Sequence, residues 1–118
     1  MKKIKTLKLN YEFKNVFDQG HYIVGKQVIT YYLNNNFGFN RLGIAISSKL
    51  GRAYRRNRLK RVIRSAYQII NKNNNFKINN NGYDIVFIWN KNCSFEDLNF
   101  HIILEDVENA FNKIKNRE

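Results

Sequence analysis

The chain has 118 residues, of which 43% are hydrophobic and 14% aromatic, and its formal net charge is +12 at pH 7. This length and composition predict one globular domain over residues 1–118 with one modest core. There is no run of about 18 apolar residues and no apolar stretch after the basic N-terminus, so we expect neither a membrane-spanning helix nor a secretory signal. A single cysteine, Cys93, excludes an intrachain disulfide and a cysteine-based zinc cluster, and fits a reducing, cytoplasmic setting.

The first predicted element is a short helix over residues 10–18. Asn10 is its expected N-cap, and Gly20 stands where helices commonly stop. Phe13 and Phe17 are four residues apart and therefore lie on one face of this helix. Two interpretations of these rings are open from the spacing: they are ordinary core aromatics, or they form a stacking platform for unpaired bases.

Four strands are predicted. Residues 21–33 are rich in β-forming side chains, and Gly25-Lys26 marks a break between two strand pieces. A turn-rich loop over 34–40 leads to the alternating apolar pattern of 41–47, which predicts the third strand. The near-continuous apolar run 83–89 predicts an interior strand that is covered on both faces.

The most basic part of the chain is residues 49–64, which hold eight of the 21 Lys and Arg residues and no acid. Apolar residues at helical spacing place one face of a helix against a core: Leu59, Val62, Ile63, Ala66 and Ile70. The opposite half of the helix carries Arg56, Asn57, Lys60, Arg61 and Arg64. A one-sided cationic array suits a polyanion, because each neutralised phosphate releases condensed counterions.

A last helix is predicted from the apolar spacing between residues 100 and 114, with Ser94 as its N-cap and Asp97 three residues later. The elements then follow the order α-β-β-β-α-β-α. We therefore expect an α+β fold, a single-domain two-layer sandwich of one four-stranded sheet and helices.

Nucleic acid is the leading partner class for this charge distribution, and an anionic membrane surface is the rival. The apolar face of the basic helix has no Trp or Phe, so it is better suited to a core than to a bilayer. Catalytic signals are weak. His21 and His101 are isolated, and there is no metal-ligand spacing or phosphate-binding glycine loop. If the protein takes part in a reaction on RNA, we expect it to hold the substrate and to supply no catalytic residue.

The stretch from Arg41 to Arg64 closely resembles the signature of the bacterial ribonuclease P protein component. The core of this signature is Arg56-Asn57-Arg58, followed by an apolar residue and Lys60-Arg61. The resemblance extends to the first helix, to the strand over 83–88 and to the closing helix, so it covers the chain in order.

The resemblance implies the small protein subunit of a ribonucleoprotein endoribonuclease that removes the 5′ leader from precursor tRNA. Its partners would be the catalytic RNA and precursor tRNA, with no membrane and no DNA partner. The RNA subunit would carry the chemistry with Mg²⁺, and no dedicated metal site is expected on the protein. It also implies an unusual left-handed crossover around the basic helix, against the usual handedness.

The resemblance implies two sets of binding residues. The RNA-binding set is Lys49, Arg52, Arg56, Asn57, Arg58, Lys60, Arg61 and Arg64. The leader-binding cleft, between the first helix and the sheet, would be lined by Phe13, Phe17 and Tyr31 and edged by Lys49 and Arg52. Two other classes stay open from the residues themselves: a ribosomal or general RNA-binding protein and a basic-helix DNA-binding protein. The Arg-Asn-Arg signature and the aromatic first helix argue against both.

Overall fold

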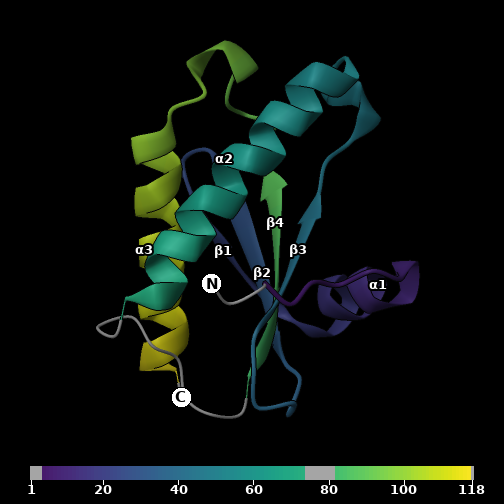
Figure 1. Cartoon of the computed structure of the whole chain (residues 1–118), viewed down its shortest axis with the longest axis vertical. Helices are drawn as coiled ribbons and strands as arrows, with labels where there is room; N and C mark the ends of the chain where they lie inside the picture. The colour runs from purple at the N-terminus through teal and green to yellow at the C-terminus, as the bar shows by residue number, and fades with distance from the viewer. Residues whose placement is uncertain (1–3, 74–81, 118) are drawn as a thin grey trace.

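The computed structural model describes residues 4–73 and 82–117, which form the predicted element order (Figure 1). The helices are α1 (Asn10–Gln19), α2 (Ala53–Lys72) and α3 (Phe100–Asn116), with the short 3-10 helices η1 (Ser48–Leu50) and η3 (Phe95–Asp97). The strands are β1 (His21–Val24), β2 (Val28–Asn34), β3 (Arg41–Ala45) and β4 (Tyr83–Trp89). Most of the asparagine-rich segment between α2 and β4 lies outside the described residues.

The strands form one mixed sheet in the order β1-β2-β4-β3. The pairs β1-β2 and β2-β4 are antiparallel, whereas β3 and β4 are parallel, so α2 is the crossover between two adjacent parallel strands. The N-terminal segment runs along the outer edge of β3, where the amide of Leu7 donates to the carbonyl of Leu42 at 2.9 Å. The α+β class and the four-stranded sheet are confirmed.

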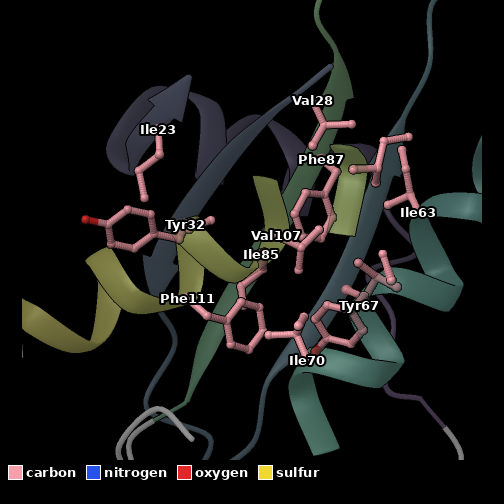
Figure 2. Packing of buried hydrophobic residues seen from close by; sticks show 14 of the residues in the cluster. Ile23, Val28, Tyr32, Ile63, Tyr67, Ile70, Ile85, Phe87, Val107 and Phe111 are labelled. Atoms are coloured by element: carbon pink, nitrogen blue, oxygen red, sulfur yellow. The ribbon is translucent and has the colours of Figure 1, made fainter. Parts of the chain in front are cut away.

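Helices cover the sheet on both sides. Ile85 and Phe87 of β4 pack in the main core with α2 and α3, as Figure 2 shows. Val86 points to the opposite face, where it packs with Val16 of α1. The expectation of two layers is therefore wrong, because α1 adds a third, incomplete layer. The physical reason lies in β4, whose alternate side chains are apolar and buried on both faces.

The predicted core face of the basic helix is confirmed. Leu59, Ile63, Ala66 and Ile70 are buried, and Val62 packs partly buried against the same cluster. The helix also buries Tyr67, which is not among the predicted core residues. Its ring centroid lies 6.2 Å from that of Phe87 and 6.0 Å from that of Phe111. Burial raises the pKa of the Tyr67 hydroxyl.

Two predicted helix caps are wrong. Asn10 is already inside α1, and the N-cap is Leu9. The Glu12 carboxylate accepts the backbone N–H groups of the two residues before Asn10, at 2.8 and 2.9 Å. Ser94 precedes the short helix η3, and α3 is capped instead by the side chain of Asn99, which accepts two backbone N–H groups of its first turn.

A buried carboxylate attaches α3 to the hairpin of β1 and β2. Asp106 accepts the backbone N–H groups of Lys26, Gln27 and Val28 at 3.0, 2.8 and 3.1 Å. A Cβ atom at Gly25 would lie 2.5 Å from the carboxyl carbon of Asp106. The glycine therefore permits the close approach, and the predicted break at residues 25 and 26 is a tight turn with its own anchor.

Candidate RNA interface

The outward face of α2 is cationic along its first three turns. Most of its predicted contact residues are exposed: Asn57, Arg58, Lys60, Arg61 and Arg64. They stand on the side of the helix opposite the buried Leu59 and Ile63. No acidic residue is present between Asp18 and Asp84 of the sequence, so no carboxylate on α2 neutralises them. Such a face can contact several phosphates at once.

The two arginines predicted to bind RNA at the entrance of α2, Arg52 and Arg56, differ in exposure and in contacts. Arg52 is the N-cap residue by backbone position and is exposed. Arg56 is half-buried, and its guanidinium donates a hydrogen bond to the carbonyl of Gly51. This contact satisfies the backbone just before the helix. Arg56 therefore holds the helix entrance as well as adding positive charge, whereas Arg52 is free to face a partner.

Arg55 turns away from the cationic face. Its guanidinium lies 5.0 Å from the ring centroid of Phe95, and it forms an ion pair with Glu96 at 3.1 Å. Hydrogen bonds from Ser94 and from the backbone, together with Arg55, lower the pKa of the Glu96 carboxyl. These contacts tie the start of α2 to the segment before α3. Sequence spacing alone does not reveal this role, because the partners are about 40 residues away.

The aromatic residues predicted for the cleft lie on the α1 face of the sheet. The rings of Phe17 and Tyr31 meet edge to face, with centroids 4.9 Å apart, and Phe17 is 37% exposed. Phe13 is half-buried and packs over Gly43. Phe13 packs against a small core cluster, whereas Phe17 presents its ring to solvent. Stacking of unpaired bases on these rings stays a prediction.

A further ring belongs to this surface. Tyr22 of β1 pairs with Tyr31 across the hairpin, and the two ring centroids are 5.6 Å apart at an interplanar angle of 35°. Tyr22 is 61% exposed. Tyr22 is not among the residues predicted for the cleft. The signal that could have found it is the hairpin register, because a short turn at Gly25 places Tyr22 opposite Tyr31.

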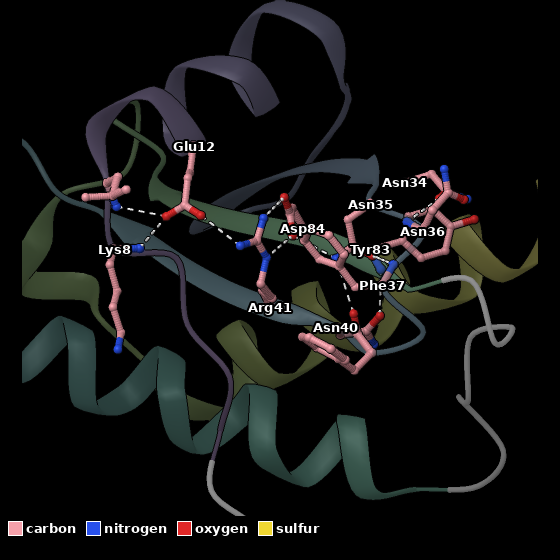
Figure 3. A network of polar contacts seen from close by, with 12 residues as sticks. Lys8, Glu12, Asn34, Asn35, Asn36, Phe37, Asn40, Arg41, Tyr83 and Asp84 are labelled. Carbon is pink, nitrogen blue, oxygen red and sulfur yellow. Dashed lines mark hydrogen bonds and ion pairs between the residues drawn. The ribbon is translucent and has the colours of Figure 1, made fainter.

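An ionic network holds α1 on the sheet (Figure 3). Arg41 of β3 makes two hydrogen bonds of 2.7 Å to Asp84 and one of 2.7 Å to Glu12 of α1. Hydrogen bonding to Asp84 raises the pKa of the Arg41 guanidinium. Backbone N–H groups, together with Arg41, lower the pKa of the Glu12 carboxyl. The network joins the start of β3, the start of β4 and the first turn of α1. It thereby fixes the position of the aromatic surface, which is formed by Phe13, Phe17, Tyr22 and Tyr31.

The two residues predicted to edge the cleft differ in position. Lys49 lines an open cavity of about 840 Å³ at the carboxyl end of β4, together with Ile29 and Ile88 of the α1 face of the sheet. Arg52 does not line it. Lys49 therefore lies near the carboxyl end of β4, whereas Arg52 lies at the entrance of α2.

The comparisons with known proteins agree with the resemblance. The model of the family described as Ribonuclease P matches residues 1–115. The ribonuclease P protein component of Fusobacterium nucleatum subsp. nucleatum is 35% identical over 114 residues, covering 95% of this chain and 98% of the relative. The chain belongs to the bacterial ribonuclease P protein component family. The ribonuclease P protein component of Caldanaerobacter subterraneus subsp. tengcongensis is 32% identical over 111 residues, covering 94% of this chain and 90% of the relative.

Solved structures of family members share the fold. The ribonuclease P protein from Thermotoga maritima superposes with a TM-score of 0.77 at 31% identity, covering 93% of this chain and 97% of the other. As a member of the ribonuclease P protein family, the chain is a subunit of a ribonucleoprotein endoribonuclease of tRNA processing, and it associates with the ribonuclease P RNA.

Within residues 4–73 and 82–117, no helix is long and apolar enough to cross a membrane. In the same ranges, no group of three His, Cys, Asp or Glu side chains could hold a metal ion. No described side chain is therefore assigned to Mg²⁺.

Proposed function

We propose that this ribonuclease P subunit grips RNA with the cationic face of α2 and binds the 5′ leader of precursor tRNA on the aromatic surface beside α1. The observation that carries the proposal is the presence of two chemically distinct surfaces on one small domain. One is a helix face of exposed cations without a carboxylate. The other is a group of aromatic rings on the opposite side of the sheet, of which Phe17 and Tyr22 are exposed.

The cationic face suits structured RNA. Arg58, Lys60, Arg61 and Arg64 are exposed at successive turns of a rigid helix, so they can contact phosphates of the ribonuclease P RNA or of the substrate. Asn57 adds a side chain that both donates and accepts hydrogen bonds. The net charge of +12 also reduces the repulsion between the two RNA molecules.

The aromatic surface suits an unpaired strand. Phe17 and Tyr31 form a fixed pair of rings, and Phe13 supports them from the same face. Stacking of a base on such a ring contributes about 1–3 kcal/mol and tolerates any sequence. A leader of variable sequence is a ligand of this kind, whereas mature tRNA lacks it.

In this assignment the reaction is the endonucleolytic removal of the leader, which gives the mature 5′ end of the tRNA. The RNA subunit supplies the chemistry with Mg²⁺, and the protein contributes no catalytic residue. Its residues bind and orient the substrate. We also assign a cytoplasmic location and no DNA partner. The crossover around α2 is expected to be left-handed, as the family resemblance implies, and that sense stays a prediction.

The leader site can be tested with single substitutions in the reconstituted holoenzyme. Phe17→Ala is expected to raise the Kd for leader-containing precursor by roughly 5- to 150-fold, which corresponds to about 1–3 kcal/mol. The Kd for mature tRNA should stay unchanged. Tyr11→Ala is the matched control, since Tyr11 is an exposed ring on the same helix. An equal loss for precursor and mature tRNA would reject the leader site.

The subunit function can be tested by cleavage. A bacterial ribonuclease P RNA at low Mg²⁺ is expected to cleave precursor tRNA faster with this chain than without it. A general RNA-binding protein would bind the RNA and leave the rate of cleavage unchanged.

A further inference from the structure

Two phenylalanines stand exposed in the loop between β2 and β3. Phe37 and Phe39 are 54% and 44% exposed, and their ring centroids lie 5.8 Å apart at an interplanar angle of 25°. Neither ring is among the residues of the two core clusters that the described part of the chain forms. Single apolar residues on a surface are ordinary, whereas apolar side chains that gather on it mark a contact surface. The pair therefore calls for a partner.

The loop holds the two rings in place before any partner arrives (Figure 3). The side chain of Asn35 accepts the backbone N–H of Phe37 at 2.9 Å and donates to the carbonyl of Phe39 at 3.2 Å. Asn36 and Gly38 have φ values of 59° and 81°, in the left-handed region that Asn and Gly enter most readily. Because the loop is already ordered, a ligand that stacks on the rings loses little of its binding energy to loop ordering.

Cations lie beside both rings. The guanidinium carbon of Arg41 is 4.7 Å from the ring centroid of Phe37, and Nζ of Lys5 is 5.5 Å from that of Phe39. The ionic network of β3, β4 and α1 holds Arg41 in its position. Lys5, in contrast, is exposed on the segment that runs along the edge of β3. Its ammonium group can leave the ring for a phosphate while a base takes its place. A flat ring with a negative charge beside it is what a nucleotide offers.

The loop is joined to the end of the cationic helix. Asn40, which follows Phe39, donates from its side chain to that of Asn71 in the last turn of α2 at 3.3 Å. Arg64 and Lys72 are exposed on the same C-terminal half of α2. An RNA bound along α2 therefore reaches the loop, and its charge is complementary to that of both surfaces.

We propose that Phe37 and Phe39 form a stacking site for one unpaired base of the ribonuclease P RNA, with Lys5 on the adjoining phosphate. The inference rests on the proposed grip of α2 on RNA and extends it past the end of the helix. A folded RNA presents such bases in its loops and bulges, where they can stack on aromatic side chains. The chain associates with the ribonuclease P RNA, so that RNA is the occupant to which we assign the site.

The first test measures the Kd of the protein for ribonuclease P RNA in the absence of precursor tRNA. Phe39→Leu keeps an apolar side chain but removes the flat ring, so it should raise this Kd at least about fivefold. Phe39→Trp keeps a flat ring and should bind within about twofold of the wild type. Tyr11→Leu is the matched control, because it removes a 68% exposed ring from α1 and should leave the Kd unchanged. An equal loss for Phe39→Leu and Phe39→Trp would overturn stacking as the role of the ring.

The second test measures the salt dependence of the same binding. Lys5→Gln should lower the slope of log K against log salt by about 0.7–0.9, because one phosphate contact is lost. Lys113→Gln, the same change on the exposed surface of α3, should leave the slope unchanged. Phe39→Leu should weaken binding at every salt concentration with the slope of the wild type. An unchanged slope for Lys5→Gln would overturn the phosphate contact.

A third variant separates this inference from the proposed function. If Arg61→Ala and Phe39→Leu both leave the Kd unchanged, the grip of α2 on RNA is rejected together with the stacking site. If only Arg61→Ala weakens binding, the stacking site alone is overturned. A loss for Phe39→Leu that appears only when precursor tRNA is present would assign the pair to the substrate and overturn its assignment to the ribonuclease P RNA.

Discussion

The ring of Phe13 occupies the space that a side chain at Gly43 would need. A Cβ atom at position 43 would lie 2.7 Å from Cε1 of Phe13 and 3.0 Å from Cδ1 of Leu7. Because β3 presents only backbone at this point, α1 can approach the sheet closely. The position of the aromatic surface therefore depends on a glycine of the strand as well as on the helix.

Gly43→Ala should displace α1. We expect the free energy of unfolding to fall by about 1–3 kcal/mol, as for other overpacked sites, and binding of the precursor leader to weaken. Urea unfolding and the ratio of precursor to mature tRNA affinity measure the two effects. In a Phe13→Ala background the same substitution should cost less, because the ring that it displaces is absent. An equal cost in both backgrounds would show that Phe13 is not what the methyl group meets.

Glu12 should make the free energy of unfolding depend on pH below about pH 4.5. Backbone hydrogen bonds and Arg41 lower the pKa of its carboxyl from the ordinary value of 4.5. A carboxyl with a lowered pKa in the folded state stabilises the protein fully above about pH 4.5, and this contribution is lost as the pH falls through the folded-state pKa. Glu12→Gln should therefore flatten the decline in unfolding free energy below pH 4.5. Glu105→Gln, an exposed change on α3, should leave the decline as it is.

Asp106→Asn should destabilise the hairpin of β1 and β2. Its two carboxylate oxygens accept three backbone N–H groups, whereas an amide presents an NH₂ group to at least one of these donors. Loss of hydrogen bonds to a charged, buried group predicts a fall of about 1.5–3 kcal/mol in the free energy of unfolding by urea. Asp18→Asn, the same change at an exposed position, should alter it by less than about 0.5 kcal/mol.

Arg61→Ala should reduce the salt dependence of binding to the ribonuclease P RNA. Removal of one phosphate contact lowers the slope of log K against log salt by about 0.7–0.9. Lys113→Ala removes the same charge from the exposed surface of α3 and should leave the slope nearly unchanged. Arg56→Ala should in addition lower stability, because its guanidinium holds the carbonyl of Gly51. An unchanged slope for Arg61→Ala would remove it from the phosphate contacts.

Local patterns predicted the elements well and their caps poorly. The apolar spacing of α2 identified its buried face, and the run over 83–89 identified β4 with the bounds that the structure has. The start of α3 was misplaced, because Ser94 and Asn99 are both good caps and the sequence does not show which one precedes the long helix. The structure ends the short helix η3 at Asp97 and places extended backbone at Asn99, whose side chain caps α3.

The sequence by itself determined the order of elements, the cationic face of α2 and the family, because these depend on neighbouring residues and on periodicity. Only the tertiary structure decided that α1 lies on the opposite face of the sheet from α2, that Phe17 meets Tyr31, and that Arg55 leaves the cationic face for Phe95. These contacts join residues far apart in the chain. Strand order and register set them, and both follow from the packing of the whole core rather than from any one segment.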